Sequence, residues 1–281
     1  MYINTHSKTT MQESLCNLLK IDLVDLNNFF IDIRASVQDG ILFDVDKFNE
    51  LVDEFIEQHT PTMQINEILF FHLSRRLNSA KDILGSINLK ELLITENDFS
   101  KFLKKFSITF KDIENKIELF HFNKHKDLNS NNRVCLYLKS RLGHNKINQD
   151  FCLNGFAFKD CLYKNDYARS LSNVPEFINQ LAQFLDYDQI SFDYYQNSTY
   201  YCFEYCIPLN NVIYDGNEYL SLEQKQTYLL RKVFFRLFDY FSSNSSYMYD
   251  HDNLILRLKD NENMLDEYYR SKEVINDDML K

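Results

Sequence analysis

The chain has 281 residues, of which 44% are hydrophobic and 26% charged, and its formal net charge is -10. This length fits one large domain or two small ones, and the composition is typical of a globular protein with a sizeable core. With only 5 Gly and 3 Pro, the chain is neither collagen-like nor linker-rich, and it contains no glycine-rich phosphate loop. Its apolar runs are far shorter than the roughly 20 residues of a membrane helix. Because the N-terminus carries no secretory signal pattern, we expect a cytoplasmic protein with no membrane partner.

The 6 cysteines are Cys16, Cys135, Cys152, Cys161, Cys202 and Cys206. None forms a C-x-x-C pair, and their spacing indicates no convergent zinc ligands. We therefore expect buried thiols, without disulfides and without a metal site.

Charge is distributed unevenly along the chain. Residues 1–60 hold 11 acidic and 4 basic side chains, whereas residues 101–146 hold 11 Lys or Arg and 4 acidic side chains. A basic segment inside an acidic protein can face the phosphates of a nucleic acid, and the alternative is a solvated surface that balances the acidic region. The aromatic residues among these cations are Phe102, Phe106, Phe110, Phe120 and Phe122. Some of them could stack on bases, although a core position is the default for most.

The first half of the chain begins with helical patterns. Apolar residues recur with a spacing near 3.6 over residues 10–60, until Thr60-Pro61-Thr62 interrupts them. Residues 64–71 predict a strand that ends at His72. Helices are expected over 78–93 and 97–106, and strands over 108–110 and 116–122. A loop is expected over 127–133.

The second half begins with a short strand predicted over 154–158 and a helical turn over 166–171. Pro175 precedes a predicted helix over 176–185, because proline favours the start of a helix. A strand region over 199–213 is broken by Pro208. Helices are expected over 221–241, where Ser221 and Gln224 form a capping-box pattern, and over 253–272. The resulting α+β organisation has an acidic helical region 1–61, a mixed core 62–215 that includes the basic segment 101–146, and a helical region 216–281.

Three short strings carry candidate chemistry. The first contains His72, Ser74, Arg75 and Asn78, followed by Ile83-Leu84; the second contains Gly155, Phe158, Asp160 and Tyr167; the third contains Glu204-Tyr205. In this order they resemble the motifs of the ADP-ribosyltransferases of the His-Tyr-Glu class, the poly-ADP-ribose-polymerase-like branch. The resemblance covers about residues 66–215. It implies an ADP-ribosyltransferase-like split β-sheet core with helical flanks, and NAD as the substrate.

The resemblance also implies roles for individual residues. Its catalytic residues would be His72, Tyr167 and Glu204, and its NAD-binding residues Leu73, Ser74, Arg75, Asn78, Gly155, Phe156, Phe158 and Tyr163. A strand carboxylate, Glu204, would stabilise the oxocarbenium-like sugar that forms when the nicotinamide–ribose bond breaks. The imidazole of His72 would hold a ribose hydroxyl, and the ring of Tyr167 would pack on nicotinamide. Arg75 would pair with the pyrophosphate.

Three positions depart from the family pattern, and they keep a second hypothesis open. Leu73 replaces the glycine after the histidine, Ala157 replaces a nicotinamide-stacking tyrosine, and Lys164 stands where a serine is usual. These changes favour a divergent transferase that transfers single units, or else a non-catalytic interaction protein with a decayed transferase fold.

The acceptor of a transferase would be RNA, DNA or a protein. Nucleic acid is favoured by the basic segment, whose candidate contacts are Lys104, Lys105, Arg133 and Arg141. Analogy with the family implies a toxin-like or phage-defence role and an antitoxin or regulatory protein as partner.

Overall fold

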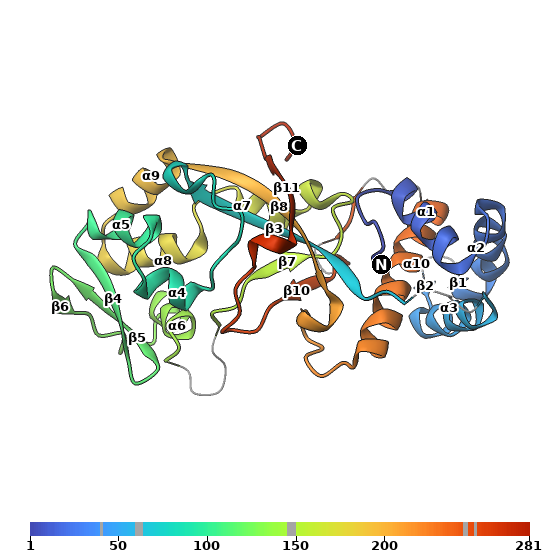
Figure 1. Cartoon of the computed structure of the whole chain (residues 1–281), viewed down its shortest axis with the longest axis horizontal. Helices are drawn as coiled ribbons and strands as arrows, with labels where there is room; N and C mark the ends of the chain where they lie inside the picture. Colours follow the sequence, from blue (N-terminus) through green and yellow to red (C-terminus); the bar gives the residue numbers. More distant parts are fainter. Residues whose placement is uncertain (40–41, 60–63, 145–149, 244–246, 250–251) are drawn as a thin grey trace. The chain divides into compact units, whose positions relative to one another are not determined.

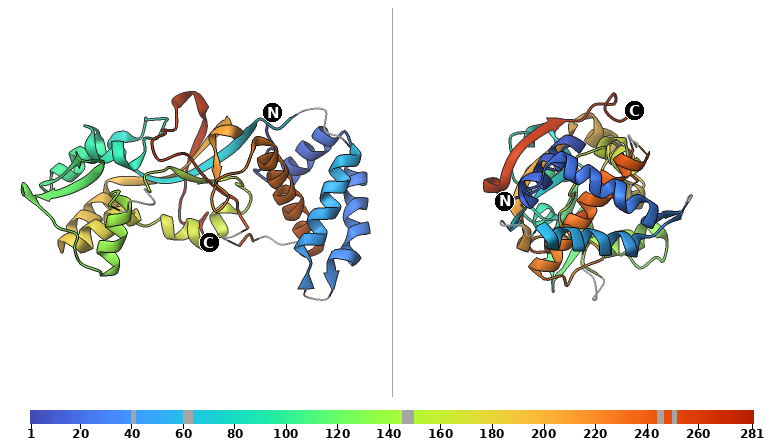
Figure 2. Two further views of the ribbon diagram at one scale, coloured as in Figure 1. Left: turned by 90° about the horizontal axis from the view of Figure 1, so that it is seen from below. Right: turned by 90° about the vertical axis from the view of Figure 1, so that its right-hand side faces the viewer.

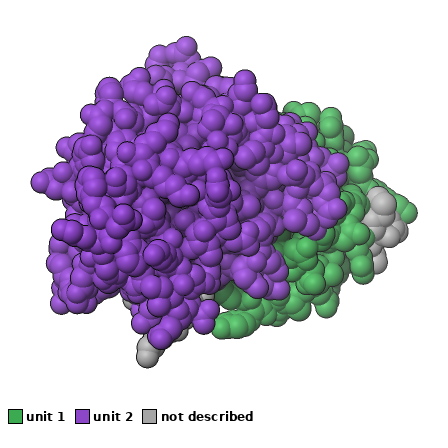
Figure 3. All heavy atoms as spheres, turned by 60° about the vertical axis from the view of Figure 1, so that its left-hand side comes forward, with its two compact units in different colours: residues 1–71, 156–165, 206–256 green, residues 72–155, 166–205, 257–281 purple. Residues whose placement is uncertain are grey.

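The computed structural model describes residues 1–39, 42–59, 64–144, 150–243, 247–249 and 252–281. Contacts divide the chain into two compact units, each assembled from segments distant in sequence (Figure 3). Unit 1 contains residues 1–71, 156–165 and 206–256, and unit 2 contains residues 72–155, 166–205 and 257–281. These divisions differ from the predicted consecutive regions, because packing joins segments that a linear pattern cannot associate. The predicted break at 60–62 lies outside the described residues.

The chain is a mixed α and β protein (Figure 1). Its α-helices are α1 (Lys8–Leu19), α2 (Leu23–Val37), α3 (Val45–His59), α4 (Leu89–Ile94), α5 (Asp98–Lys104), α6 (Arg133–Arg141), α7 (Asp166–Leu171), α8 (Glu176–Leu185), α9 (Gln189–Gln196) and α10 (Leu222–Ser243). Its 3-10 helices are η1 (Asn78–Ala80), η2 (Leu162–Lys164), η3 (Leu209–Asn211) and η4 (Asp266–Tyr268).

The strands are β1 (Gln38–Asp39), β2 (Leu42–Phe43), β3 (Glu67–Leu77), β4 (Ile108–Ile113), β5 (Lys116–His121), β6 (Lys124–His125), β7 (Asn154–Phe156), β8 (Ser198–Pro208), β9 (Ile213–Tyr214), β10 (Ile255–Arg257) and β11 (Tyr269–Val274). The largest sheet has the strand order β11-β8-β3-β7-β10-β9. A three-stranded sheet has the order β4-β5-β6, and β1 pairs with β2.

In unit 1, helices α1, α2 and α3 pack with α10 (Figures 1 and 2). An aromatic cluster joins them: Phe30 of α2 contacts Phe234, Phe238 and Phe241 of α10, with ring centres 5.8–6.2 Å apart. The helical prediction over 10–60 is confirmed at α1, α2 and α3, but β1 and β2 lie between α2 and α3. The helix predicted over 221–241 is confirmed by α10. The capping box of α10 is present as well, because the Ser221 amide donates to Gln224 and the Gln224 amide donates to Ser221.

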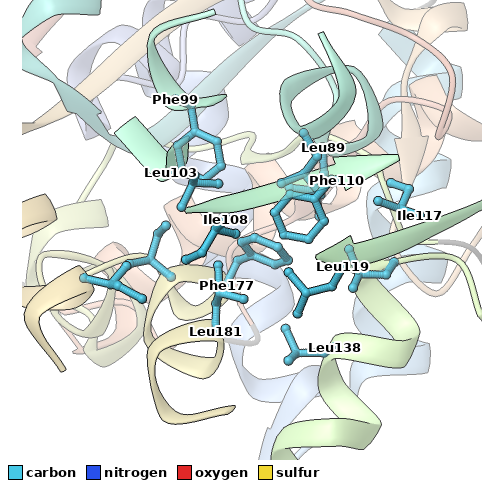
Figure 4. Close-up of a cluster of buried hydrophobic side chains, with 14 of the residues drawn as sticks. Leu89, Phe99, Leu103, Ile108, Phe110, Ile117, Leu119, Leu138, Phe177 and Leu181 are labelled. Carbon is cyan, nitrogen blue, oxygen red and sulfur yellow. The ribbon is translucent and has the colours of Figure 1, made fainter. Parts of the chain in front are cut away.

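In unit 2, strands β4 and β5 pair antiparallel from Ile108↔His121 to Ile113↔Lys116. Their inner side chains join those of the surrounding helices in a buried cluster (Figure 4). Its labelled members are Leu89, Phe99, Leu103, Ile108, Phe110, Ile117, Leu119, Leu138, Phe177 and Leu181. The strands predicted at 108–110 and 116–122 and the helices at 97–106 and 176–185 are confirmed. Helices α6 and α9 were not predicted from the sequence.

The helix predicted over 78–93 is wrong. Only η1 and α4 are helical there, and the chain between them contains Gly85, where a Cβ would lie 2.5 Å from the Met264 carbonyl oxygen. Asn88 then starts α4 by accepting a hydrogen bond from the Glu91 amide at 3.0 Å. The predicted strand end at His72 is also wrong, because β3 continues to Leu77.

The helix predicted over 253–272 is wrong as well. This segment contains β10, η4 and the start of β11. Strand β11 pairs antiparallel with β8, with Ser271 opposite Glu204 and Lys272 opposite Phe203. Pairing with a strand far away in sequence overrides the local polar pattern, which carries no information about such a partner.

Candidate functional site

His72 lies within β3, and alternate positions along this strand place His72, Ser74 and Arg76 on one face. The guanidinium carbon of Arg76 lies 3.7 Å from the centre of the Phe203 ring on β8. Tyr205, two residues beyond Phe203, donates its hydroxyl to the Leu84 carbonyl at 2.7 Å, and Arg76 donates to the neighbouring Ile83 carbonyl at 2.7 Å. His72, Arg76, Phe203 and Tyr205 therefore share a face, which we call the His72 face.

Glu204 points to the opposite face. It lies between Phe203 and Tyr205 on an extended strand, where side chains alternate. The pairing with β11 agrees: Ser271, opposite Glu204, donates its hydroxyl to Glu204 Oε2 at 2.7 Å. Lys272, opposite Phe203, instead has its ammonium 5.7 Å from the Tyr201 ring centre. We call this opposite side the Glu204 face.

Tyr167 belongs to a helix that lies on the Glu204 face. Tyr200, four residues before Glu204 on β8, donates its hydroxyl to the Ala168 carbonyl of α7 at 2.9 Å. Tyr167 is adjacent to Ala168 in this helix, and its side chain is 45% exposed. The structure thus brings the helix of Tyr167 to the face of Glu204 and places His72 on the other face.

The imidazole of His72 has a defined tautomer. Its Nδ1 lies 2.7 Å from the Asn154 carbonyl oxygen, and a carbonyl can only accept, so Nδ1 carries the proton and Nε2 carries a lone pair. The pKa of His72 is lowered from 6.5 to about 4, chiefly by burial; the hydrogen bond to the Asn154 carbonyl opposes this shift, and the nearby Arg76 charge contributes to it. Near neutral pH this imidazole is uncharged, and Nε2 can accept a hydrogen bond.

Arg75 points away from the His72 face and fixes main-chain groups. It donates to the Ser172 carbonyl at 2.8 Å and to the Ser198 carbonyl at 3.0 Å, and it stacks 4.2 Å from the Tyr195 ring centre. These contacts hold the chain after α7 against the start of β8. The guanidinium on the His72 face belongs to the neighbouring Arg76, which was not predicted as a site residue. Because side chains alternate along a strand, Arg76 could have been predicted to share the face of His72, four residues earlier.

Further polar groups lie around Arg76. Arg76 donates to the Ser86 hydroxyl, which lies 3.3 Å from the Tyr205 hydroxyl. Asp266 accepts from the Gly85 amide at 2.7 Å. Burial lowers the pKa of Arg76 and raises the pKa of Tyr205, and the charge of Asp266 acts upward on both. The His72 face therefore combines a neutral imidazole, a guanidinium, two hydroxyls and a carboxylate.

The remaining residues of the first string have structural surroundings. Leu73 is buried and Ser74 is half-buried. The amide oxygen of Asn78 accepts from the Thr199 hydroxyl at 2.8 Å, and its main-chain amide donates to the Asn197 carbonyl at 2.8 Å. These bonds secure the end of β3.

The second string is divided between the units. Gly155 belongs to unit 2, whereas Phe156, Phe158 and Tyr163 belong to unit 1. Phe156 and Phe158 are buried, and the Phe158 amide donates to the Asn253 side chain at 3.1 Å. Both phenylalanines are core residues of unit 1.

Asp160, also in the second string, belongs to a buried ion pair of unit 1. Its carboxylate accepts from Arg236 Nε at 2.7 Å and from the Tyr240 hydroxyl at 2.7 Å. Arg236 also donates to Asp239 at 2.7 Å. Asp160 and Arg236 are 6% and 4% exposed, so the carboxylate anchors α10 within the unit.

The candidate acceptor-binding cations differ in accessibility. Lys104 and Lys105, at the end of α5, and Arg133, the first residue of α6, are exposed. Arg141 is largely covered and forms an ion pair with Asp150 at 2.6 Å. Lys146 of the predicted basic segment lies outside the described residues.

All six cysteines are thiols in the structure, and four of them are buried. Within the described ranges, no group of three or more His, Cys, Asp or Glu side chains is arranged to hold a metal ion. None of the helices in these ranges has both the length and the apolar character needed to cross a bilayer. Comparison with family models, with curated proteins and with solved structures finds no match to the chain.

Proposed function

We propose that the chain is an NAD-dependent ADP-ribosyltransferase in which His72 holds a ribose hydroxyl of NAD. The observation that supports this best is the state of the imidazole, which is neutral, oriented by Asn154 and able to accept a hydrogen bond at Nε2. Such a group fixes a sugar hydroxyl without adding positive charge beside a cationic transition state. The proposal is also supported by the order of the three strings, which resembles that of the His-Tyr-Glu class.

A transferase built on the His72 face needs a carboxylate on that face. Glu204 points the other way, whereas Asp266 lies near Arg76 and Tyr205. In the proposed reaction NAD is a substrate: the C1′–N bond breaks and neutral nicotinamide leaves with the bonding electrons. A lone pair of the acceptor forms the new bond to C1′, and the acceptor's proton is released to water. Asp266 would stabilise the positive charge that develops on the sugar, and Arg76 would contact the pyrophosphate.

Nicotinamide release from NAD tests this proposal directly. We expect release by the wild type and at least a tenfold loss in His72→Asn, which keeps a donor near Asn154 but lacks the imidazole. Asp266→Asn should also lose activity, although its oxygen can still accept from Gly85, while Glu204→Gln should retain it. No release by the folded wild type would refute the transferase. Loss in Glu204→Gln with full activity in Asp266→Asn would refute the assignment of the active face.

The acceptor we propose is nucleic acid, supported by the exposed Lys104 and Lys105. Incubation with labelled NAD and separate RNA, DNA and protein fractions identifies the acceptor class by the fraction that becomes labelled. If only the protein fraction becomes labelled, the acceptor is a protein and not a nucleic acid. A toxin-like or phage-defence role and an antitoxin partner remain proposals by analogy with the family.

A second candidate function is a non-catalytic interaction protein. The separation of His72 and Glu204 onto opposite faces favours it, because the pair named by the resemblance does not converge. A folded wild type that neither binds NAD nor releases nicotinamide would support this candidate.

A further inference from the structure

The turn between β5 and β6 contains a residue that its backbone disfavours. Pairing of His121 with Lys124 leaves Phe122 and Asn123 as a two-residue turn, and their φ angles are 49° and 58°. Two successive positive φ angles define a type I′ turn, which prefers Asn and Gly. A bulky side chain in this left-handed region costs roughly 1 kcal/mol. Backbone conformation therefore does not account for a phenylalanine here.

Burial does not account for Phe122 either. Its side chain is 63% exposed, whereas Phe102 and Phe110 of the same segment are buried at 5% and 8%. The His121 ring lies 4.4 Å from the Phe122 ring centre, so one side of the exposed ring is supported. Among the interleaved aromatics that the sequence offered for base stacking, Phe122 is the one that the structure presents to solvent.

Cations surround this turn. The Phe122 amide donates to the Ser107 carbonyl at 2.9 Å, which brings the turn beside the end of α5 with the exposed Lys104 and Lys105. Lys124 follows directly and is exposed, and the charge of Lys126 contributes to lowering the pKa of His121, after burial. The nearest acidic side chain of β5, Glu118, is engaged by His125 at 2.7 Å. The surface around the ring is therefore predominantly basic.

The opposite end of the same strands provides a contrast. The turn between β4 and β5 has the same geometry, with φ angles of 54° and 64°, but its residues are Glu114 and Asn115. Ile113 beside it is 46% exposed. Both turns adjoin β5, whose inner side chains Ile117 and Leu119 belong to the buried core cluster (Figure 4). The exposed ring of Phe122 thus lies at the end of the strands that also has Lys104, Lys105 and Lys124.

We propose that Phe122 stacks on a base of single-stranded nucleic acid while Lys104, Lys105 and Lys124 contact its phosphates. A single strand is favoured because its bases are accessible to a projecting ring, whereas those of a duplex are stacked on each other. Stacking accepts any base, so the site selects strandedness rather than sequence. This inference goes beyond the proposed transferase, and binding can be measured without NAD.

The test is fluorescence anisotropy of the full chain with labelled oligo(U) and oligo(dT) of about 12 nucleotides, a length within the usual range of such sites. The decisive variant is Phe122→Asn, because Asn is favoured in a type I′ turn and keeps or raises the stability of the hairpin. We expect this variant to bind about 5- to 100-fold more weakly, while its melting temperature does not fall. Phe122→Trp should bind within about twofold of the wild type, since it keeps a stacking ring.

Controls separate stacking from general charge attraction. Ile113→Ser, at the other end of the strands, should leave affinity unchanged. Lys105→Ala should reduce the slope of log affinity against log salt by about 0.7, the value for one phosphate contact on a single strand.

Wild-type affinity in Phe122→Asn would overturn the proposal. So would failure of the wild type to bind either oligonucleotide at low salt, or competition by poly-glutamate as effective as that by the unlabelled oligonucleotide. Because oligonucleotide binding is measured without NAD, failure of this inference is distinguishable from failure of the transferase.

Discussion

The guanidinium of Arg76 stacks 3.7 Å from the centre of the Phe203 ring, and this contact determines the direction of the next side chain, Glu204. A strand that presents Phe203 to Arg76 must present Glu204 to the other side. The resemblance to the His-Tyr-Glu class joins His72 and Glu204 by their order in the sequence. In the sheet these two side chains lie on opposite faces, because side chains alternate along each strand.

The free energy of unfolding should fall as the pH falls from 6.5 to about 4, because in this range His72 is protonated in the unfolded chain but not in the folded protein. The folded pKa of about 4 lies below the ordinary value of 6.5, so between these values the unfolded chain binds more protons. The free energy of unfolding should therefore decrease by up to about 3 kcal/mol from pH 7 to pH 4 on account of this group. Urea unfolding of the wild type and His72→Gln at several pH values measures this contribution. A stability difference between the two proteins that does not change with pH would contradict it.

Removal of Arg236 should destabilise the protein strongly. Arg236→Leu leaves the buried Asp160 carboxylate without its cation, which we expect to cost about 3 to 5 kcal/mol. Arg231→Ala is a matched control on the same helix, because its pair with Asp53 is about one-third exposed. That change should cost about 0 to 1 kcal/mol. Chemical denaturation of both variants checks the contrast, and equal losses would refute it.

Alanine should be tolerated differently at two glycines with positive φ. Gly143 and Gly216 have φ angles of 72° and 75°, but only at Gly143 would a Cβ meet a close neighbour, Phe151 Cζ at 2.7 Å. Gly216→Ala should cost about 1 kcal/mol from backbone strain alone. Gly143→Ala should cost about 1 to 3 kcal/mol more, since a packed ring must shift. Thermal unfolding would disprove this if Gly216→Ala were the more destabilised variant.

The hydroxyl of Tyr205 should contribute measurably to stability. This fully buried side chain donates to the Leu84 carbonyl at 2.7 Å and supports the segment between η1 and α4. Tyr205→Phe should lower the free energy of unfolding by about 1 to 2 kcal/mol, because the carbonyl loses a donor. Tyr219→Phe serves as the control, since Tyr219 is 98% exposed, and it should change stability by less than about 0.5 kcal/mol. An unchanged midpoint in Tyr205→Phe would argue against this contact.

Local sequence signals were sufficient to predict several elements. Helix α8 follows Pro175, α10 begins at the Ser221–Gln224 capping box, and β4 and β5 follow local apolar patterns. Each of these signals acts between residues a few positions apart, so a linear reading can detect it. The basic character of residues 101–146 and the presence of aromatics among them could also be recognised from the sequence.

Which side chains share a face, and which segments share a unit, depends on contacts between residues distant in sequence. The apolar pattern of β3 allowed His72 as its last residue, but pairing extends the strand to Leu77 and places Arg76 beside His72 rather than Arg75. Strand β11 forms because it pairs with β8, although its own sequence favours a polar helix. Phe122 is the exposed member of the five phenylalanines in this segment because it lies in a turn, whereas Phe102 and Phe110 are buried in the core. In each case the deciding interaction joins residues distant in sequence, and side-chain direction depends on that partner.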